Sequence, residues 1–252
     1  MKIIKLLAVL LIVAIIAGFV AGTYANDLRV ILSKLGPGGN PATITFKISY
    51  AGFISLGEAV IINKGLEDFG PDRVYHLSAR VKPNKLADYF YKITANADSF
   101  IDRHSLCPLK FRQELIISGK TKDEKIILYD QKNQVMEINN KKRVILPNTY
   151  DPLSAMLRIM NQDLTLGKAF DMNINTSQKN YRLLANVMEK RQLQIGKNIF
   201  DVYLLKGSVA RRDKSLRHSS KFELWILDKP KKIILTAKIY TNIGLITIRH
   251  AN

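Results

Sequence analysis

Apolar and polar residues alternate along most of the chain, which is the pattern of β-strands with one buried and one solvated face. The first such segment is Thr43–Tyr50, and Ala51-Gly52 after it permits a turn before the apolar run Ala59–Ile62. Short polar turns separate the later segments, which lie at residues 75–81, 109–117, 125–129, 135–138, 143–146, 170–174, 181–187, 200–209, 221–227, 232–240 and 245–250. The pattern predicts a mainly β fold, a large curved antiparallel sheet or partly closed barrel with one or two short helices.

Three segments interrupt this alternation. Gly65–Asp72 is expected to form a loop, and Lys120–Asp123 a polar turn. Lys85–Ala97 fits two structures: a short helix with residues 86, 90, 93 and 97 on one face, or a twisted strand that uses the aromatic residues 89–91. We favour the helix for this segment.

The apolar residues take a helical spacing at Tyr150–Gly167. Asp151 can cap this helix because its carboxylate accepts unpaired N–H groups of the first turn. Pro152 fits the first helical position, where no N–H donor is needed. The apolar stripe contains the residues at positions i, i+3, i+4 and i+7, which are Leu153, Met156, Leu157 and Met160. The spacing predicts one short amphipathic helix packed on the sheet.

The start of the chain has the features of an export signal. Lys2 and Lys5 precede the apolar run Leu6–Val20, and small residues lead to a cleavage site after Ala25. Two interpretations of residues 1–25 stay open, a cleaved signal peptide and a retained N-terminal anchor, for which the run is short. Both place the protein in the periplasm or on the outer face of the inner membrane. Residues 26–42 are then a flexible lead-in, and residues 43–252 a single β-rich domain.

The chain is strongly basic, with 39 Lys and Arg against 21 Asp and Glu and a formal net charge of +18. Such an excess indicates an anionic partner, although a generally basic proteome would also explain it. Because export argues against nucleic acid, the expected partners are an anionic membrane surface or an acidic envelope polymer. Cys107 is the only cysteine, so no intramolecular disulfide can form, and we expect it to be a small buried residue.

Basic side chains crowd two late turns, and we call them the predicted basic face. Its residues are Arg211, Arg212, Lys214, Arg217, Lys229, Lys231 and Lys232. The two turns could lie at the same end of the sheet if the strands pair as a meander, and a basic rim there would attract anionic head groups. Two solvated hairpin tips are the alternative interpretation.

The sequence contains no motif for catalysis or metal binding. Its four histidines lie apart from one another and from the cysteine, at positions 76, 104, 218 and 250, so neither a metal nor another cofactor is expected. Asp98 and Asp102 could share a helix face as an acid–base pair, but turn and cap roles explain them as well. Asp228, close to the only tryptophan, is expected to accept hydrogen bonds in the turn toward Lys232. No catalytic residue is predicted.

Four short motifs, in order, carry a resemblance to a known family. They are Phe46–Ala59; Ser99–Asp102 with Pro108–Phe111; Asp151–Ser154 with Leu157-Arg158 and Leu166-Gly167; and Trp225–Asp228 with Pro230. Over roughly Thr43–Ile248 they resemble the domain-of-unknown-function 3108 family of exported bacterial proteins. The chain departs from the family by Met156, where an aromatic residue is common, and by the lysines around Pro230. The resemblance implies an envelope protein with a fold similar to periplasmic lipoprotein carriers, and it implies no activity.

Two functions from different classes fit these expectations. The first is a non-enzymatic binding module whose curved sheet holds a lipid or acyl chain. Its candidate lining residues are Leu153, Met156, Leu157, Met160 and Trp225. A Met and Leu stripe of this kind also suits a filled core. The second function is a structural or interaction protein of the envelope that docks through the predicted basic face. An enzyme acting on wall polymer is third, and it would need a buried carboxylate pair in a cleft.

Overall fold

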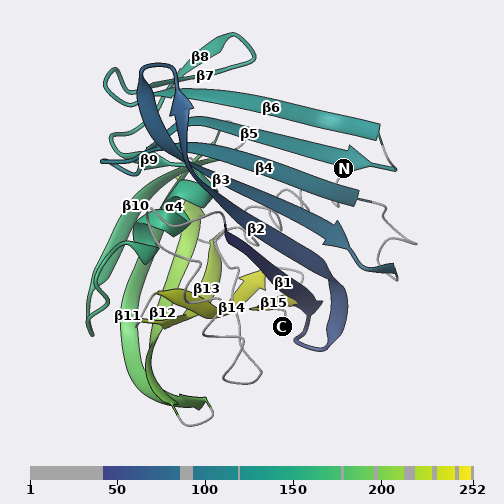
Figure 1. The fold of residues 1–252 in the computed structure, drawn as a ribbon, viewed down its shortest axis with the longest axis vertical. Helices are drawn as coiled ribbons and strands as arrows, with labels where there is room; N and C mark the ends of the chain where they lie inside the picture. Colours follow the sequence, from purple (N-terminus) through teal and green to yellow (C-terminus); the bar gives the residue numbers. More distant parts are fainter. Residues whose placement is uncertain are drawn as a thin grey trace.

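The structure, a computed structural model, describes residues 42–250 except 86–92, 119, 177–178, 196–197, 213–218, 229–231 and 242–243. In these residues, one helix, α4 (Pro152–Met160), packs against a single sheet of 15 strands. The strands are β1 (Ala42–Tyr50), β2 (Ile54–Phe69), β3 (Asp72–Pro83), β4 (Ile93–Asp102), β5 (Pro108–Ile117), β6 (Lys120–Asp130), β7 (Val135–Ile138), β8 (Lys141–Val144), β9 (Thr149–Tyr150), β10 (Ala169–Thr176), β11 (Lys179–Ile195), β12 (Asn198–Arg211), β13 (Ser220–Leu227), β14 (Ile233–Thr241) and β15 (Gly244–His250). The predicted large curved antiparallel sheet is confirmed (Figure 1).

The sheet consists of two meanders that meet at its centre. Strands β1 to β8 follow one another outward to one edge, and strands β9 to β15 lead from the other edge back to the centre. There β15 pairs with β1, with Ile48 opposite Ile248. β9 pairs with β10 in parallel, and the other neighbouring strands pair antiparallel. Because β8 and β9 are edges and do not pair with each other, the sheet is curved but open.

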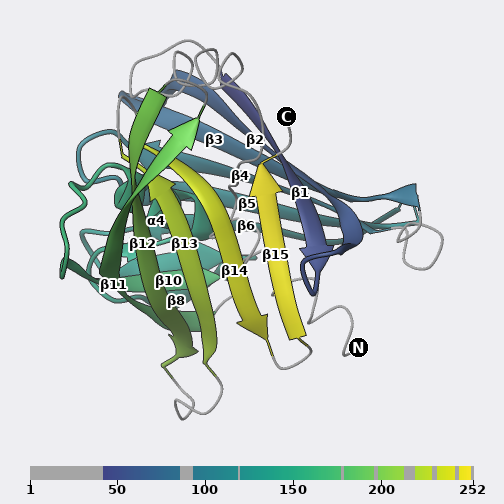
Figure 2. The same cartoon turned by 90° about the horizontal axis from the view of Figure 1, so that it is seen from below.

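Strand alternation gives the sheet an apolar inner face and a polar outer face. On five adjacent strands, from β1 across to β12, one row of directly opposed residues is at most 5% exposed: Ile48, Ile248, Ala237, Leu224 and Leu205. Their neighbours along the strands, such as Lys47 and Arg249, point to the outer face and are exposed. Figure 2 shows these strands side by side from below. The inner-face residues join one continuous core that also includes α4.

The loop expected at Gly65–Asp72 is wrong. β2 continues through Phe69, and the turn to β3 occupies only residues 70–71. A bulge between Asn63 and Gly65 shifts the register of β2 against β3. This inserted residue interrupts the sequence alternation without ending the strand. The polar turn expected at Lys120–Asp123 is also wrong, because β6 already begins at Lys120.

The helix expected at Lys85–Ala97 is wrong for Ile93–Ala97, where β4 begins. Ile93, Ala95 and Ala97 are buried and the residues between them are half-buried, which is the period of a strand. Residues 86–92 of the expected helix lie outside the described residues. Asp98 and Asp102 therefore lie on a strand and do not share a helix face.

Helix α4 begins as predicted, with Asp151 as its N-cap. The Asp151 carboxylate accepts hydrogen bonds from the backbone N–H groups of Leu153 (2.8 Å) and Ser154 (2.9 Å), and the Ser154 hydroxyl accepts one from the Asp151 N–H (2.9 Å). The Ser99 hydroxyl on β4 donates to the same carboxylate at 2.5 Å. Asp151, Ser99 and Ser154 are completely buried. Burial raises the pKa of Asp151 to about 6.

Further hydrogen bonds connect the first meander to the second beside α4. The Tyr129 hydroxyl on β6 donates to the side-chain oxygen of Asn175 on β10 (3.3 Å), and the Gln131 amide donates to the Thr149 carbonyl on β9 (2.8 Å). The helix itself packs against β4, β9 and β10 (Figure 1). The region around α4 therefore joins the two halves of the sheet on the side opposite the β1–β15 pair.

We predict that Asp151→Ala lowers the free energy of unfolding by about 3 kcal/mol, because it removes the cap and leaves the buried Ser99 hydroxyl without its acceptor. Asp151→Asn keeps an acceptor for the helix N–H groups and serves as the matched control. Urea unfolding at pH 7 measures both variants. An equal loss in Asp151→Ala and Asp151→Asn would contradict the role of the cap.

The raised pKa of Asp151 also predicts a pH dependence. At Asp151 the folded protein binds a proton more tightly than the unfolded chain, so the contribution of this group to stability is greatest below pH 4 and falls as the pH rises through about 6. Relative to Asp151→Asn, wild-type protein should lose about 2 kcal/mol of unfolding free energy between pH 4 and pH 7. Urea titrations of the two proteins across this range provide the measurement. If the unfolding free energies of the two proteins changed in parallel with pH, the raised pKa of Asp151 would be refuted.

Candidate functional site

The apolar stripe predicted on helix α4 is only partly buried in the core. Leu153 is completely buried, but Met156, Leu157 and Met160 are only partly buried at the edge of the core. Ala155 and Ile159 are buried too, on the other side of the helix from Leu153. The helix therefore has buried residues on two sides, which the spacing of a single apolar stripe does not predict. Three large apolar side chains thus remain accessible on α4.

Trp225 does not join these helix residues. Its neighbours Leu224 and Ile226 are completely buried, whereas Trp225 is half-buried in β13. Alternation along the strand places the indole ring on the outer face. The Arg191 guanidinium lies over the ring, 5.1 Å from its centroid. The predicted common lining by α4 and Trp225 is therefore wrong, because the two belong to opposite faces of the sheet.

The predicted basic face is divided by the strand between its two turns. β12 ends at Arg211 and β13 begins at Ser220, while β13 ends at Leu227 and β14 begins at Ile233. The two turns thus lie at opposite ends of β13, and the expectation of one sheet end is wrong. Four of the predicted residues lie outside the described residues, and they are Lys214, Arg217, Lys229 and Lys231.

The three described members of the predicted basic face already have protein partners. Arg211 is not without a partner, and the Arg212 guanidinium donates a hydrogen bond to the side-chain oxygen of Asn173. Lys232 pairs with Asp228 (3.5 Å) and lies 3.9 Å from Asp163 after α4. Asp228 thus forms an ion pair with Lys232 at the end of the turn, and the hydrogen bonds expected there stay a prediction. These contacts explain the described basic residues as local links in the fold.

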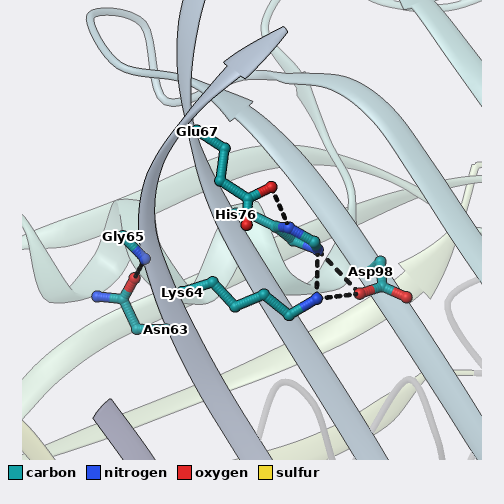
Figure 3. A network of polar contacts seen from close by, with 6 residues as sticks. All are labelled: Asn63, Lys64, Gly65, Glu67, His76 and Asp98. Atoms are coloured by element: carbon teal, nitrogen blue, oxygen red, sulfur yellow. Dashed lines mark hydrogen bonds and ion pairs between the residues drawn. The ribbon is translucent and has the colours of Figure 1, made fainter. Parts of the chain in front are cut away.

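The outer face holds a polar cluster that the sequence analysis missed, which we call the His76 cluster (Figure 3). His76 on β3 is 6% exposed. Its Nδ1 lies 2.7 Å from Glu67 on β2, and its Nε2 lies 2.9 Å from Asp98 on β4. Lys64 Nζ reaches the same Nε2 (3.2 Å) and Asp98 (3.5 Å). The cluster therefore spans three neighbouring strands.

The bulge in β2 positions the cluster, because the extra residue lets Lys64 point to the face that carries His76. Asn63 supports the bulge by accepting a hydrogen bond from the Gly65 N–H at 2.9 Å. Phe100, opposite His76, stacks on the imidazole with ring centroids 4.2 Å apart. Polar residues at alternating positions of β3 and β4 were the available signal, but the bulge hid which β2 residues complete the cluster.

The His76 cluster suits a structural role better than proton transfer. Each ring nitrogen lies at hydrogen-bond distance from a carboxylate, so the imidazole presents no free nitrogen to a substrate. The hydrogen bond from His76 lowers the pKa of Asp98 to about 2, with smaller contributions from Ser78 and Lys64. Among the described residues, no group of three or more His, Cys, Asp and Glu could hold a metal ion.

Two further predicted features have clear outcomes. Cys107 is 2% exposed and forms no disulfide, and burial raises the pKa of its thiol, which confirms the buried cysteine.

The predicted leader, residues 1–25, lies outside the described residues. Over the part of the chain that the structure covers, no helix has the length and apolar character needed to cross a bilayer.

Comparisons with known proteins agree with the fold. Residues 45–249 match the family described as "Protein of unknown function (DUF3108)". No curated protein matches the chain. A solved structure, the β-barrel-like protein of domain of unknown function DUF1849 from Brucella abortus, is similar with a TM-score of 0.57 and 9% sequence identity. That match covers 84% of this chain and 96% of the Brucella chain.

A second solved structure, a protein with a YmcC-like fold from Bacteroides fragilis, has a TM-score of 0.35 and 8% identity. It covers 87% of this chain and 97% of its own. At such identities only the likeness to the Brucella protein bears on the fold, and it supports the β-barrel-like curvature of the sheet.

We predict that Asp98→Asn lowers the free energy of unfolding by about 2 kcal/mol at pH 7, because His76 and Lys64 lose their shared carboxylate. The lowered pKa means that this stabilisation is present above pH 4 and is lost as the pH falls toward 2. The difference in unfolding free energy between Asp98→Asn and wild type, measured by urea titration, should therefore become smaller below pH 4. Asp68→Asn on the same hairpin, whose side chain is 87% exposed, is the control and should match wild type. Equal effects of the two substitutions would contradict the cluster.

Proposed function

The chain belongs to the DUF3108 family of proteins of unknown function, and from this premise we propose that it is a non-enzymatic protein of the bacterial envelope that binds a lipid or another acyl-bearing ligand at α4. The open curve of the sheet supports the proposal, because ligands of this type bind in concave, mostly apolar sites. The helix at the junction of the two meanders would supply the apolar contact.

One observation carries the proposal: Met156, Leu157 and Met160 lie close together on one helix, stay partly exposed, and pack against the core. Accessible clusters of large apolar side chains often mark ligand or interaction sites, because water does not favour them. Methionine side chains are flexible and adapt to acyl chains of different shape. The N-cap holds the start of α4 rigidly, so the accessible residues are presented at a defined place.

Export and the absence of catalysis belong to the same proposal. Lys2, Lys5 and the apolar run Leu6–Val20 support passage across the inner membrane. The engagement of both nitrogens of His76 supports a role without proton transfer. A carrier or sensor of a lipid needs neither a nucleophile nor a general base.

The experiment is native mass spectrometry with lipid extraction on protein purified from an envelope fraction. We expect an adduct of defined lipid mass on the wild-type protein. The double substitution Leu157→Gln and Met160→Gln should lower the bound fraction about tenfold, because two apolar contacts with the acyl chain are replaced by polar ones. Circular dichroism confirms that the variant keeps its β structure.

The matched control replaces two exposed apolar residues far from α4, Val144 (75% exposed) and Ile199 (64% exposed), with Gln. This control should bind lipid like the wild type. A wild-type protein that carries no lipid and takes up none on titration with phospholipid would overturn the proposal. Equal losses in both double variants would overturn the assignment to α4.

A further inference from the structure

The outer face of the central strands carries a group of basic side chains distinct from the predicted basic face. We call it the outer basic patch, and its residues are Lys47, Lys206, Lys221, Lys238 and Arg249. They lie on five adjacent strands, β12 to β15 and β1. All but Lys238, which is half-buried, are exposed. Because alternation directs these side chains to one face, they form a single surface.

The register brings like charges together on this surface. Lys47 on β1 lies directly opposite Arg249 on β15. Glu223 on β13 lies between Lys206 and Lys238 on the flanking strands. Directly opposed like charges destabilise a sheet pair. An external anion that lies over Lys47 and Arg249 would remove this repulsion.

The carboxylates of the protein do not balance the patch. Glu223 pairs with Lys206 at 3.0 Å, and Glu58 lies opposite both Lys47 and Lys82. Among the described residues, neither Lys238 nor Arg249 has an ion-pair partner. Glu189 also acts on Lys206 and pairs with Arg191. Three carboxylates thus face seven basic residues, the five of the patch with Lys82 and Arg191, and a net positive charge remains on this surface.

The outer face of β5 and β6 provides a contrast within the same sheet. There Arg112 pairs with Glu124 at 2.8 Å. Glu114 accepts hydrogen bonds from Asn96 and Thr121, each at 3.0 Å. That region satisfies its own charges, so the excess on β12 to β15 and β1 is a local feature and does not merely follow from the basic composition of the chain.

Two aromatic residues share the surface with the outer basic patch. Trp225 lies on β13 between Glu223 and the end of the strand, and Tyr240 on β14 is 42% exposed and opposite Lys221. Arg191 lies over the Trp225 ring. Tryptophan and tyrosine favour the interface between head groups and acyl chains, because each ring has an apolar body and a polar edge. Basic side chains around such rings fit anionic head groups and their apolar border together.

We propose that the outer basic patch, with Trp225 and Tyr240, docks the protein on a bilayer that contains anionic phospholipids. The five basic side chains spread over a broad sheet surface, which matches an extended charged plane better than a small anion. Trp225 enters the head-group region and Arg191 turns to a phosphate. The docking surface is on the outer face, so it does not depend on an acyl site at α4 and can exist without one.

The test measures binding of the full-length protein to vesicles of phosphatidylethanolamine with phosphatidylglycerol, and to vesicles of phosphatidylcholine alone. The ratio of the two affinities isolates the electrostatic contribution from any insertion of the apolar N-terminal run. We expect preferential binding to the anionic vesicles, lost at about 0.5 M salt because exposed charges are then screened. Trp225, the only tryptophan, should shift its emission to the blue on binding without any added label.

The double substitution Lys47→Gln and Arg249→Gln should weaken binding to anionic vesicles about 30-fold, since each basic residue contributes about a fivefold increase in affinity. The matched control, Lys141→Gln and Lys142→Gln, removes the same charge from the exposed edge strand β8 and should leave binding unchanged. Equal losses in both variants would show that net charge drives binding and would overturn the proposal. Binding to soluble polyglutamate but not to anionic vesicles, or an unshifted Trp225 emission, would overturn it too. Retained lipid adducts in a variant that no longer docks would separate this proposal from the acyl site.

Discussion

The fold depends on a buried carboxylate that joins a helix to a strand. The sheet has two meanders, and only the β1–β15 pair connects them by a strand ladder. On the other side Asp151 accepts hydrogen bonds from the first turn of α4 and from Ser99 on β4, and the Tyr129–Asn175 and Gln131–Thr149 hydrogen bonds add to this connection. Burying a carboxylate is unfavourable, and the raised pKa of Asp151 expresses that penalty. Hydrogen bonds from three donors to the carboxylate offset part of this penalty.

Strand β4 carries polar links on both of its faces. Ser99 points inward to Asp151, while the adjacent Asp98 points outward to His76. The two aspartates have the same side chain, yet their pKa values are displaced in opposite directions. Complete burial dominates for Asp151, and donation from His76 dominates for the partly exposed Asp98. β4 is therefore fixed laterally to β2 and β3 on the outside and to the helix on the inside.

The sequence predicted those parts of the fold that depend on local spacing. The alternation in Thr43–Tyr50 and the cap at Asp151 each require only a few neighbouring residues, and both are confirmed. Predictions were wrong where a bulge adds one residue to a strand, or where the spacing of apolar residues fits both a helix and a strand. The bulge at Asn63 and Gly65 made a continuous strand resemble a loop, and the spacing of Ile93 and Ala97 fits a helix as well as a strand.

The site residues were harder to predict because they depend on register between distant strands. Met156, Leu157 and Met160 were placed correctly on a helix, but their partial exposure depends on how α4 packs against β4, β9 and β10, which lie in separate parts of the sequence. Trp225 was assigned to the inner face although its completely buried neighbours occupy that face. The pairing of Lys47 with Arg249 joins the two ends of the described chain, so no local pattern contains it.

A single sheet can combine an apolar interior and a basic exterior because successive side chains alternate. Leu224 lies in the core and Trp225 on the outer face, although they are neighbours in β13. A substitution on one face consequently leaves the backbone hydrogen bonds and the opposite face largely intact. Binding of an acyl chain near α4 and attachment to a charged bilayer would then vary independently unless the strands transmit a change between them. Because α4 packs on β10, the strand ladder from β10 through β11 to β12 is the direct physical connection between the two proposed activities.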